Sequence, residues 1–214
     1  MSKKLPDTFE RTVRAFTMPD IRAEQDGGII QGHAAVFNQA TDIGGWFQEI
    51  IERGAFDNTD FRDVVLTVNH DLSKIPLARS RNNNVNSTLQ LSIDSQGLFT
   101  RAKLDIENNS DAKALYSAIG RGDISGMSFI FAVREQKWEN LDTDYPTRRI
   151  LDIAKVYEVS AVSFPAYSGT DISARDKQAL ESARAALGSE RSGLESSKDE
   201  LEVLKLRTQI LMKG

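Results

Sequence analysis

The sequence predicts an α+β protein: a mostly antiparallel β-barrel or strongly curved sheet with flanking helices, followed by a C-terminal helical tail. Three observations predict this class. Short β-rich runs recur between polar turns, one stretch has clear helical start and stop signals, and all aromatic residues and all five prolines lie at or before Tyr167. We expect a flexible N-terminus at 1–10, a compact domain at 11–171 and a tail at 172–214.

Four strands are expected before the helix. Gly28–Phe37 and Val64–His70 are rich in β-branched and apolar residues, and the second run ends in a polar cluster. Leu89–Ile93 alternates strictly between apolar and polar residues, Asp94–Gly97 has turn chemistry, and Leu98–Leu104 resumes a β-rich pattern. These last three segments predict a hairpin.

The clearest helix of the domain is predicted at Ala112–Ile119. Ser110 and Asp111 provide an N-cap, and Gly120 and Gly122 lie where such a helix would end.

Three more strands are expected after the helix. Ser128–Val133 and Arg149–Ile153 are separated by the polar loop Glu139–Pro146, and a last strand at Lys155–Phe164 is stopped by Pro165.

Leucines recur at intervals of seven in the tail, which places them on one face of a helix. They form two series: Leu180, Leu187, Leu194 and Leu201, then Leu204 and Leu211. Gly188 and Gly193 weaken the pattern, since each costs about 1 kcal/mol in a helix interior. Three interpretations stay open: a homo-oligomer or partner-docking coiled coil, an amphipathic helix on its own domain, and a disordered tail.

Composition excludes several function classes. The net charge of −4 gives no overall basic field, so no specific nucleic acid is expected as a partner. The absence of cysteine removes disulfides and thiolate nucleophiles, and two histidines make a His-rich metal site unexpected. No apolar stretch is long enough for a signal peptide or a membrane span. We expect a cytoplasmic, soluble protein without a cofactor or a bound metal.

Nucleophilic hydrolysis in this chain would need a Ser or Thr nucleophile and a histidine base, because histidine titrates near neutral pH. His33 and His70 are the two candidates. His70 follows an apolar strand inside Asn69–Asp71, where a side chain can face a cleft, whereas His33 lies inside a glycine-rich strand. A surface histidine, or one with a structural hydrogen bond, is the alternative for each.

Ser128 and Glu158 are the other unusual positions. Ser128 follows a glycine at the start of an apolar strand, where it is either a nucleophile or a strand-start serine without chemistry. Glu158 lies among valines, and alternation places it on one strand face with Ser160 and Val162. It either orients an imidazole or lies on an exposed sheet face.

Several segments, in order from about Arg11 to Thr170, resemble the prohead proteases of tailed bacteriophages. These are serine peptidases related in fold to the herpesvirus capsid-maturation proteases. The segments that carry the resemblance are Gly32–Asn38, Glu49–Phe56, Asn69–Asp71 with Pro76–Arg79, Asp94–Leu98, Ile124–Phe131 and Glu158–Tyr167.

The resemblance implies that Ser128 is the nucleophile and His70 the general base. It also implies that Glu158 is the third member, holding the imidazole tautomer. Asp71, Asp152 and Ser160 compete for that third role. His33 lies in a matching segment, but the resemblance gives it no role.

The resemblance also implies a place of action. Such an enzyme works in the host cytoplasm, inside the assembling procapsid, where it cleaves the scaffolding segment of the major capsid protein and often itself. The Ala, Ser, Glu and Lys content of the tail at 172–214 would suit a self-cleaved linker. A non-catalytic capsid assembly or scaffolding protein is the alternative. A metal-dependent hydrolase is a third class, which the spacing of the carboxylates does not favour.

Overall fold

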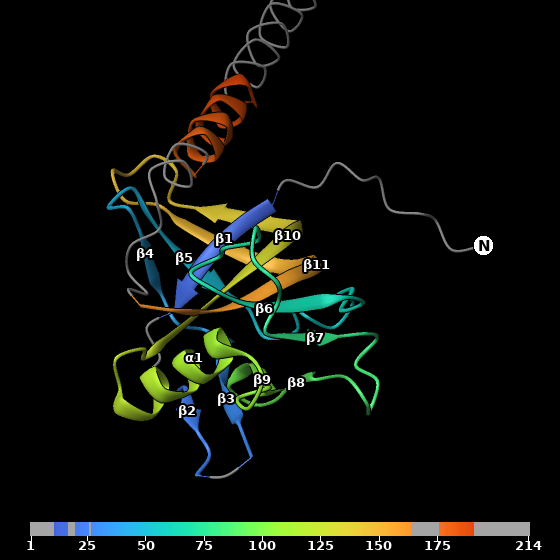
Figure 1. Ribbon diagram of the computed structural model, residues 1–214. Coiled ribbons are helices and arrows are strands. Elements are labelled where there is room, and N and C mark those ends of the chain that lie inside the picture. The colour runs from blue at the N-terminus through green and yellow to red at the C-terminus, as the bar shows by residue number, and fades with distance from the viewer. Residues whose placement is uncertain (1–10, 17–19, 26, 164–175, 191–214) are drawn as a thin grey trace, which may run out of the picture.

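The computed structural model describes residues 11–16, 20–25, 27–163 and 176–190. Two β-sheets make up the body of the protein (Figure 1). The larger sheet lies above in that view, and the smaller sheet lies below it with helix α1. Residues 176–190 form a second helix, drawn in orange-red, beyond the larger sheet.

The larger sheet has seven strands. Five lie side by side in the order β1 (Arg11–Phe16), β10 (Gly126–Glu139), β11 (Thr147–Val162), β5 (Phe47–Ile51) and β4 (Thr41–Ile43). The other two are β6 (Val64–Val68), which pairs with β11, and β7 (Ala78–Ser80), which pairs with β6. Strand β11 is 16 residues long, so it pairs in parallel with β5 along its first part and with β6 along its second. This places the end of β6 beside residues 158–161.

The smaller sheet is antiparallel, with its strands in the order β2 (Arg22–Ala23), β3 (Ile29–Val36), β9 (Gly97–Lys103) and β8 (Leu89–Ile93). Strands β8 and β9 form the predicted hairpin. Gly97 is required at its turn, because a Cβ there would lie 1.9 Å from the carbonyl oxygen of Ala35.

The predicted barrel is wrong, although the α+β class holds. Neither sheet is closed or strongly curled: among the described strands the larger sheet keeps β1, β4 and β7 as edges, and the smaller keeps β2 and β8. Most of the described strand pairings are antiparallel, as predicted, but β11 pairs in parallel with β5 and β6. Apolar alternation reports which face of a strand is buried but not which strand lies beside it, so it could not distinguish two packed sheets from a barrel.

Helix α1 (Ser110–Arg121) extends the predicted helix at both ends. Its N-cap is Asn109, not Ser110 or Asp111: the Asn109 side chain accepts hydrogen bonds from the backbone N–H groups of Asp111 and Ala112. The helix runs through Gly120 and ends at Arg121, and its C-cap is Gly122, whose φ of 79° is left-handed.

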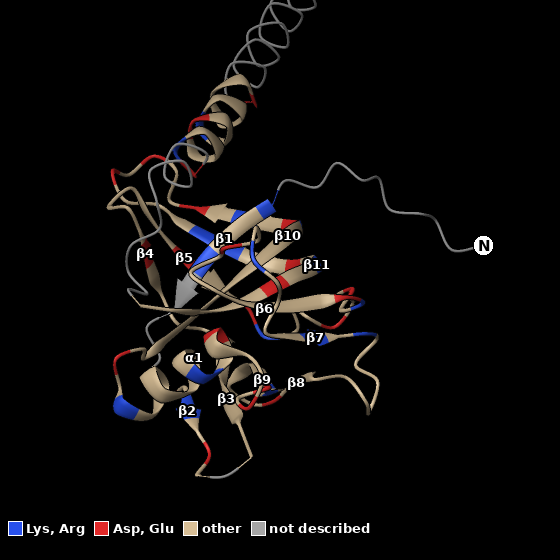
Figure 2. Cartoon of the chain, viewed as in Figure 1, with Lys and Arg blue, Asp and Glu red and all other residues tan. Residues whose placement is uncertain are grey.

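The main core lies on one face of β10, where the Phe129 and Phe131 rings stack at 4.3 Å between centroids. Met127 and Phe129 belong to this core, so period-2 alternation turns the Ser128 side chain to the opposite face of the strand. Figure 2 shows acidic and basic residues interspersed over the larger sheet rather than gathered on one side.

The described part of the tail packs on the larger sheet. Leu180 is buried in a second apolar cluster with Ile43 and Phe47, and Arg184 donates to the carbonyl oxygens of Leu141 and Thr143. No helix among the described residues is long and apolar enough to cross a lipid bilayer.

Parts of several predicted segments lie outside the described residues. These are the N-terminus at 1–10, the end of the domain at 164–171, the start of the tail, and the leucines Leu194, Leu201, Leu204 and Leu211. A homo-oligomer through the tail stays a prediction.

Candidate active site

Three adjacent strands bring the candidate catalytic residues to one face of the larger sheet. Ser128 on β10 lies opposite Ser160 on β11, which lies opposite Thr67 on β6. Glu158 precedes Ser160 by two residues, so it shares that face. His70 follows β6 in the loop that leads toward β7. The pairing of β6 with β11 therefore brings residues 70, 128 and 158 together.

The three side chains form a continuous chain of hydrogen bonds. His70 Nε2 is 2.6 Å from Ser128 Oγ, and His70 Nδ1 is 2.8 Å from Glu158 Oε2. Ser128 and Glu158 are buried, whereas the His70 side chain is 21% exposed. A hydroxyl, an imidazole and a carboxylate in this order are suited to activating a nucleophile.

A second layer of hydroxyl groups holds Glu158 and His70 in place. Thr67 Oγ1 donates to Glu158 Oε1 and lies 3.2 Å from Ser160 Oγ. Ser160 Oγ accepts the backbone N–H of His70 at 3.0 Å. A buried carboxylate is costly without such partners. The sequence reasoning missed Thr67, although it is a hydroxyl residue within the apolar run Val64–Val68.

The backbone that presents His70 is unusual. Asn69 and His70 have φ values of 50° and 59°, both in the left-handed region, which costs of order 1–3 kcal/mol for each non-glycine residue. Asn69 donates its backbone N–H to the carbonyl of Ala161, and its side-chain Oδ1 accepts the N–H of Ser163. These two hydrogen bonds, to β11 and to the residue that follows it, fix the turn that directs the imidazole toward Ser128.

The other candidates for the third role have different contacts. The Asp71 carboxylate accepts from the backbone and hydroxyl of Ser73, and these hydrogen bonds lower the pKa of Asp71. Asp152 pairs with Arg134 at 2.7 and 2.8 Å. Ser160 contacts the backbone of His70, as described above, while Glu158 faces the imidazole.

His33 lies between two carboxylates, away from this chain of hydrogen bonds. Its Nδ1 contacts Asp20, and its Nε2 is 2.9 Å from Asp94 Oδ2. Burial disfavours the charged imidazole, but the hydrogen bonds and the attraction of Asp20 and Asp94 outweigh burial and raise the pKa of His33. Both ring nitrogens face carboxylates, so His33 joins three segments of the chain, and its charged form has a partner at each nitrogen.

Strand β1 supplies a second neighbour of the candidate nucleophile. Ser128 Oγ also lies 2.7 Å from the carbonyl oxygen of Arg14. A carbonyl can only accept, so the Ser128 hydroxyl proton has two acceptors within reach, Arg14 O and His70 Nε2. The sequence offered no sign of this contact, which joins residues 114 positions apart.

The side chain of Arg14 fastens β1 in this position. Its buried guanidinium donates to Glu49 at 2.6 and 2.9 Å and to Asp176, in the second helix, at 2.8 and 3.1 Å. Arg148 also donates to Glu49. Burial raises the pKa of Glu49, but the attraction of the two arginines outweighs it and lowers that pKa overall. For Asp176 burial prevails and raises the pKa.

No group of three or more His, Asp or Glu side chains within the described ranges is arranged to hold a metal ion.

Residues 17–184 match the model of a family described as caudovirus prohead serine protease. No curated protein and no solved structure matches the chain. The match spans most of the 214 residues and includes positions 70, 128 and 158. The chain therefore belongs to the caudovirus prohead serine protease family.

Proposed function

We propose that this protein is a serine endopeptidase that cleaves the scaffolding segment of the major capsid protein, and also itself, inside the assembling procapsid. Family membership supports the general class. One observation carries the mechanism: His70 Nε2 lies 2.6 Å from Ser128 Oγ while its Nδ1 lies 2.8 Å from Glu158.

The first half of the reaction forms an acyl-enzyme. Ser128 Oγ attacks the carbonyl carbon of the scissile peptide, and His70 Nε2 takes the hydroxyl proton as the new C–O bond forms. Glu158 keeps the Nδ1 proton in place and stabilises the imidazolium. His70 then passes the proton to the leaving amine as the C–N bond breaks.

The second half regenerates the enzyme. A water molecule gives a proton to His70 Nε2 and attacks the acyl carbon, and the C–O bond to Ser128 breaks. The proton returns to Ser128 Oγ, leaving a new carboxyl terminus on the substrate. In this scheme the Ser128 hydroxyl must donate to His70 rather than to the carbonyl of Arg14.

The experiment combines a reactive probe with cleavage of the capsid precursor. A fluorophosphonate should label the wild-type protein at Ser128, and a shortened capsid band should appear. Ser128→Ala and His70→Ala should lose cleavage while keeping the fold, as judged by circular dichroism. Ser92→Ala, at an exposed serine outside the site, is the matched control and should behave as wild type.

Cleavage retained by purified Ser128→Ala would refute the mechanism. Co-assembly with the capsid precursor without any cleavage would instead favour the non-catalytic assembly protein.

A further inference from the structure

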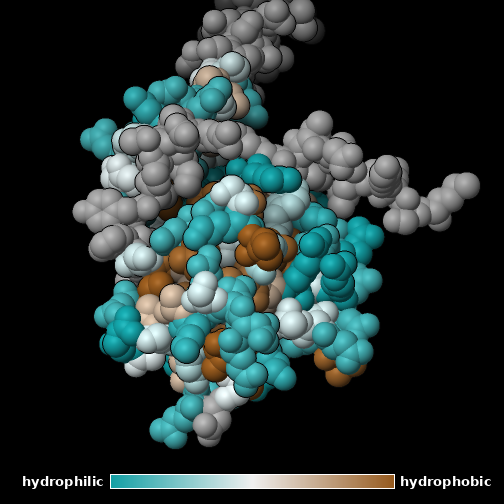
Figure 3. Space-filling model, viewed as in Figure 1, coloured by the Kyte–Doolittle hydropathy of each residue, from teal (hydrophilic) through white to brown (hydrophobic). Residues whose placement is uncertain are grey.

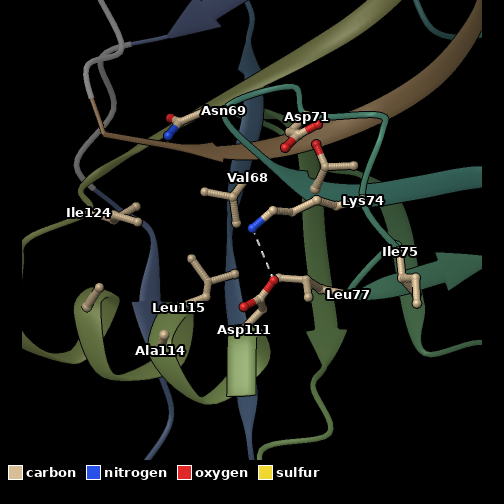
Figure 4. Close-up of a pocket in the computed structure, with 12 residues that line it drawn as sticks. Val68, Asn69, Asp71, Lys74, Ile75, Leu77, Asp111, Ala114, Leu115 and Ile124 are labelled. Atoms are coloured by element: carbon tan, nitrogen blue, oxygen red, sulfur yellow. Dashed lines mark hydrogen bonds and ion pairs between the residues drawn. The ribbon is translucent and has the colours of Figure 1, made fainter. Parts of the chain in front are cut away.

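A cavity of about 390 Å³ opens between helix α1 and the loop that joins β6 to β7. Figure 4 shows Val68 and Leu115 pointing into it from opposite sides. Its size falls within the range typical of ligand pockets, about 300–1,000 Å³. No residue of the hydrogen-bonded chain Ser128, His70 and Glu158 lines it, so the cavity is a separate part of the surface.

The walls of this cavity are nevertheless continuous with the candidate active site. Asn69 and Asp71, the two residues that flank His70, line it. Thr67, which donates to Glu158, also lines it. Ile124 lies two residues before the start of β10, the strand that carries Ser128. The mouth of the cavity therefore lies beside the backbone that presents His70.

The chemistry of the walls favours an uncharged apolar side chain. The interior is aliphatic, with Val68, Leu77, Leu115 and Ile124. Lys74 and Asp111 face each other at 3.2 Å across the cavity (Figure 4), so their charges balance. Both side chains are more than half exposed. An exposed ion pair of this kind contributes little to stability, so separating Lys74 from Asp111 to admit a side chain costs little free energy.

The loop beside the cavity adds exposed apolar surface. Leu72 is 53% and Ile75 is 85% exposed, both in the loop that carries His70. Figure 3 shows a brown patch over this loop, surrounded by hydrophilic residues. Large apolar side chains held in water beside a cavity are typical of a surface that contacts a partner.

We propose that this cavity is a specificity subsite, which binds one aliphatic side chain of the peptide substrate near the scissile bond while Leu72 and Ile75 contact the adjoining residues. The proposal rests on the proposed peptidase function. It assigns the choice of cleavage site to α1 and the β6–β7 loop rather than to the catalytic residues.

The test narrows the cavity from its exposed side. Ala114 lines it and is exposed on α1, so Ala114→Leu should fill space without disturbing the core. Lys113→Leu is the matched control, because Lys113 is an exposed neighbour on the same helix that does not line the cavity. The probes are peptides spanning the cleavage site mapped in the capsid precursor, each with Leu, Gly or Asp at one position.

At one peptide position the wild type should prefer Leu to Gly and reject Asp, since an unpaired carboxylate would lose its hydration among aliphatic side chains. Ala114→Leu should lower the ratio of kcat/KM for Leu over Gly at that position by about 10-fold or more, because a pocket responds strongly to one added group. Lys113→Leu should leave the ratio as in wild type. Ile75→Ser should lower kcat/KM several-fold for the whole series.

Two failures are distinguishable. If the wild type is neither labelled by the fluorophosphonate nor able to cleave any peptide, the proposed function is wrong. If labelling and cleavage are normal but Ala114→Leu shifts no position of the preference, the subsite assignment is overturned.

Discussion

Replacing Glu158 with glutamine removes a buried negative charge from behind the imidazole and keeps the shape of the side chain. In the wild type both carboxylate oxygens accept, one from Thr67 and the other from His70 Nδ1 at 2.8 Å. An amide has one acceptor and one donor end. The variant can therefore satisfy both neighbours only if one of them changes its role.

The size of the effect follows from which neighbour changes. If the Thr67 hydroxyl rotates to accept, the amide oxygen still faces His70, and only the charge is lost. A hydrogen bond to a charged group contributes about 1.5–3 kcal/mol against about 0.5–1.5 kcal/mol for a neutral one. The difference of roughly 1–2 kcal/mol lowers kcat by about 5- to 30-fold.

If the amide nitrogen faces Nδ1 instead, it holds the imidazole in the wrong tautomer, and losses in serine proteases then approach about 10⁴-fold. Thr67 can rotate toward Ser160, 3.2 Å away. We therefore expect kcat of Glu158→Gln to fall by at least about 5- to 30-fold, with KM little changed.

The assay is steady-state cleavage of a peptide from the mapped capsid site by wild type, Glu158→Gln and Asp152→Asn. Asp152 is the matched control, because its carboxylate pairs with Arg134. A Glu158→Gln enzyme within two-fold of the wild-type kcat would show that Glu158 does not support His70. A loss of kcat confined to Asp152→Asn would transfer the role to that residue.

Three further outcomes concern stability and are measured by urea unfolding. Ser160→Ala should cost about 1–3 kcal/mol, because the backbone N–H of His70 loses its acceptor; no loss would mean that water replaces the hydroxyl. His33→Gln should destabilise the protein more at pH 5.5 than at pH 9. Because the pKa of His33 is raised in the folded protein, its protonation stabilises the fold fully below the unfolded pKa of about 6.5, and this contribution is lost as pH rises through the folded pKa. An equal loss of stability in His33→Gln at both pH values would contradict this. Glu49→Gln should cost about 3–5 kcal/mol, since it leaves buried arginine charge uncompensated. The matched Glu52→Gln, at a more exposed ion pair, should cost at most about 1 kcal/mol.

Local patterns predicted local structure well. Alternation placed Glu158 and Ser160 on one strand face, and in the structure both lie against His70, one through its side chain and the other through its backbone. The hairpin and α1 follow from turn and capping chemistry within a few residues. The shift of the N-cap from Ser110 to Asn109 shows that neighbouring polar residues compete for one role.

Long-range pairing could not be predicted. The sequence predicts two strands, at Arg149–Ile153 and Lys155–Phe164, whereas β11 is one strand whose two parts pair with different partners. Strand β1 was not predicted, and Arg14 gave no sign that its partners would be Glu49 and Asp176, 35 and 162 positions away. Such contacts depend on the whole fold, so no window of neighbouring residues contains them.

The attachment of β1 also sets an order of events during synthesis of the chain. Arg14 leaves the ribosome early, and Glu49, Arg148 and Asp176 follow in that order. The Asp176 carboxylate accepts two of the hydrogen bonds that the Arg14 guanidinium donates. A nascent chain that ends before residue 176 lacks that carboxylate. The strand whose carbonyl contacts Ser128 thus acquires its last anchor only when most of the polypeptide has been made.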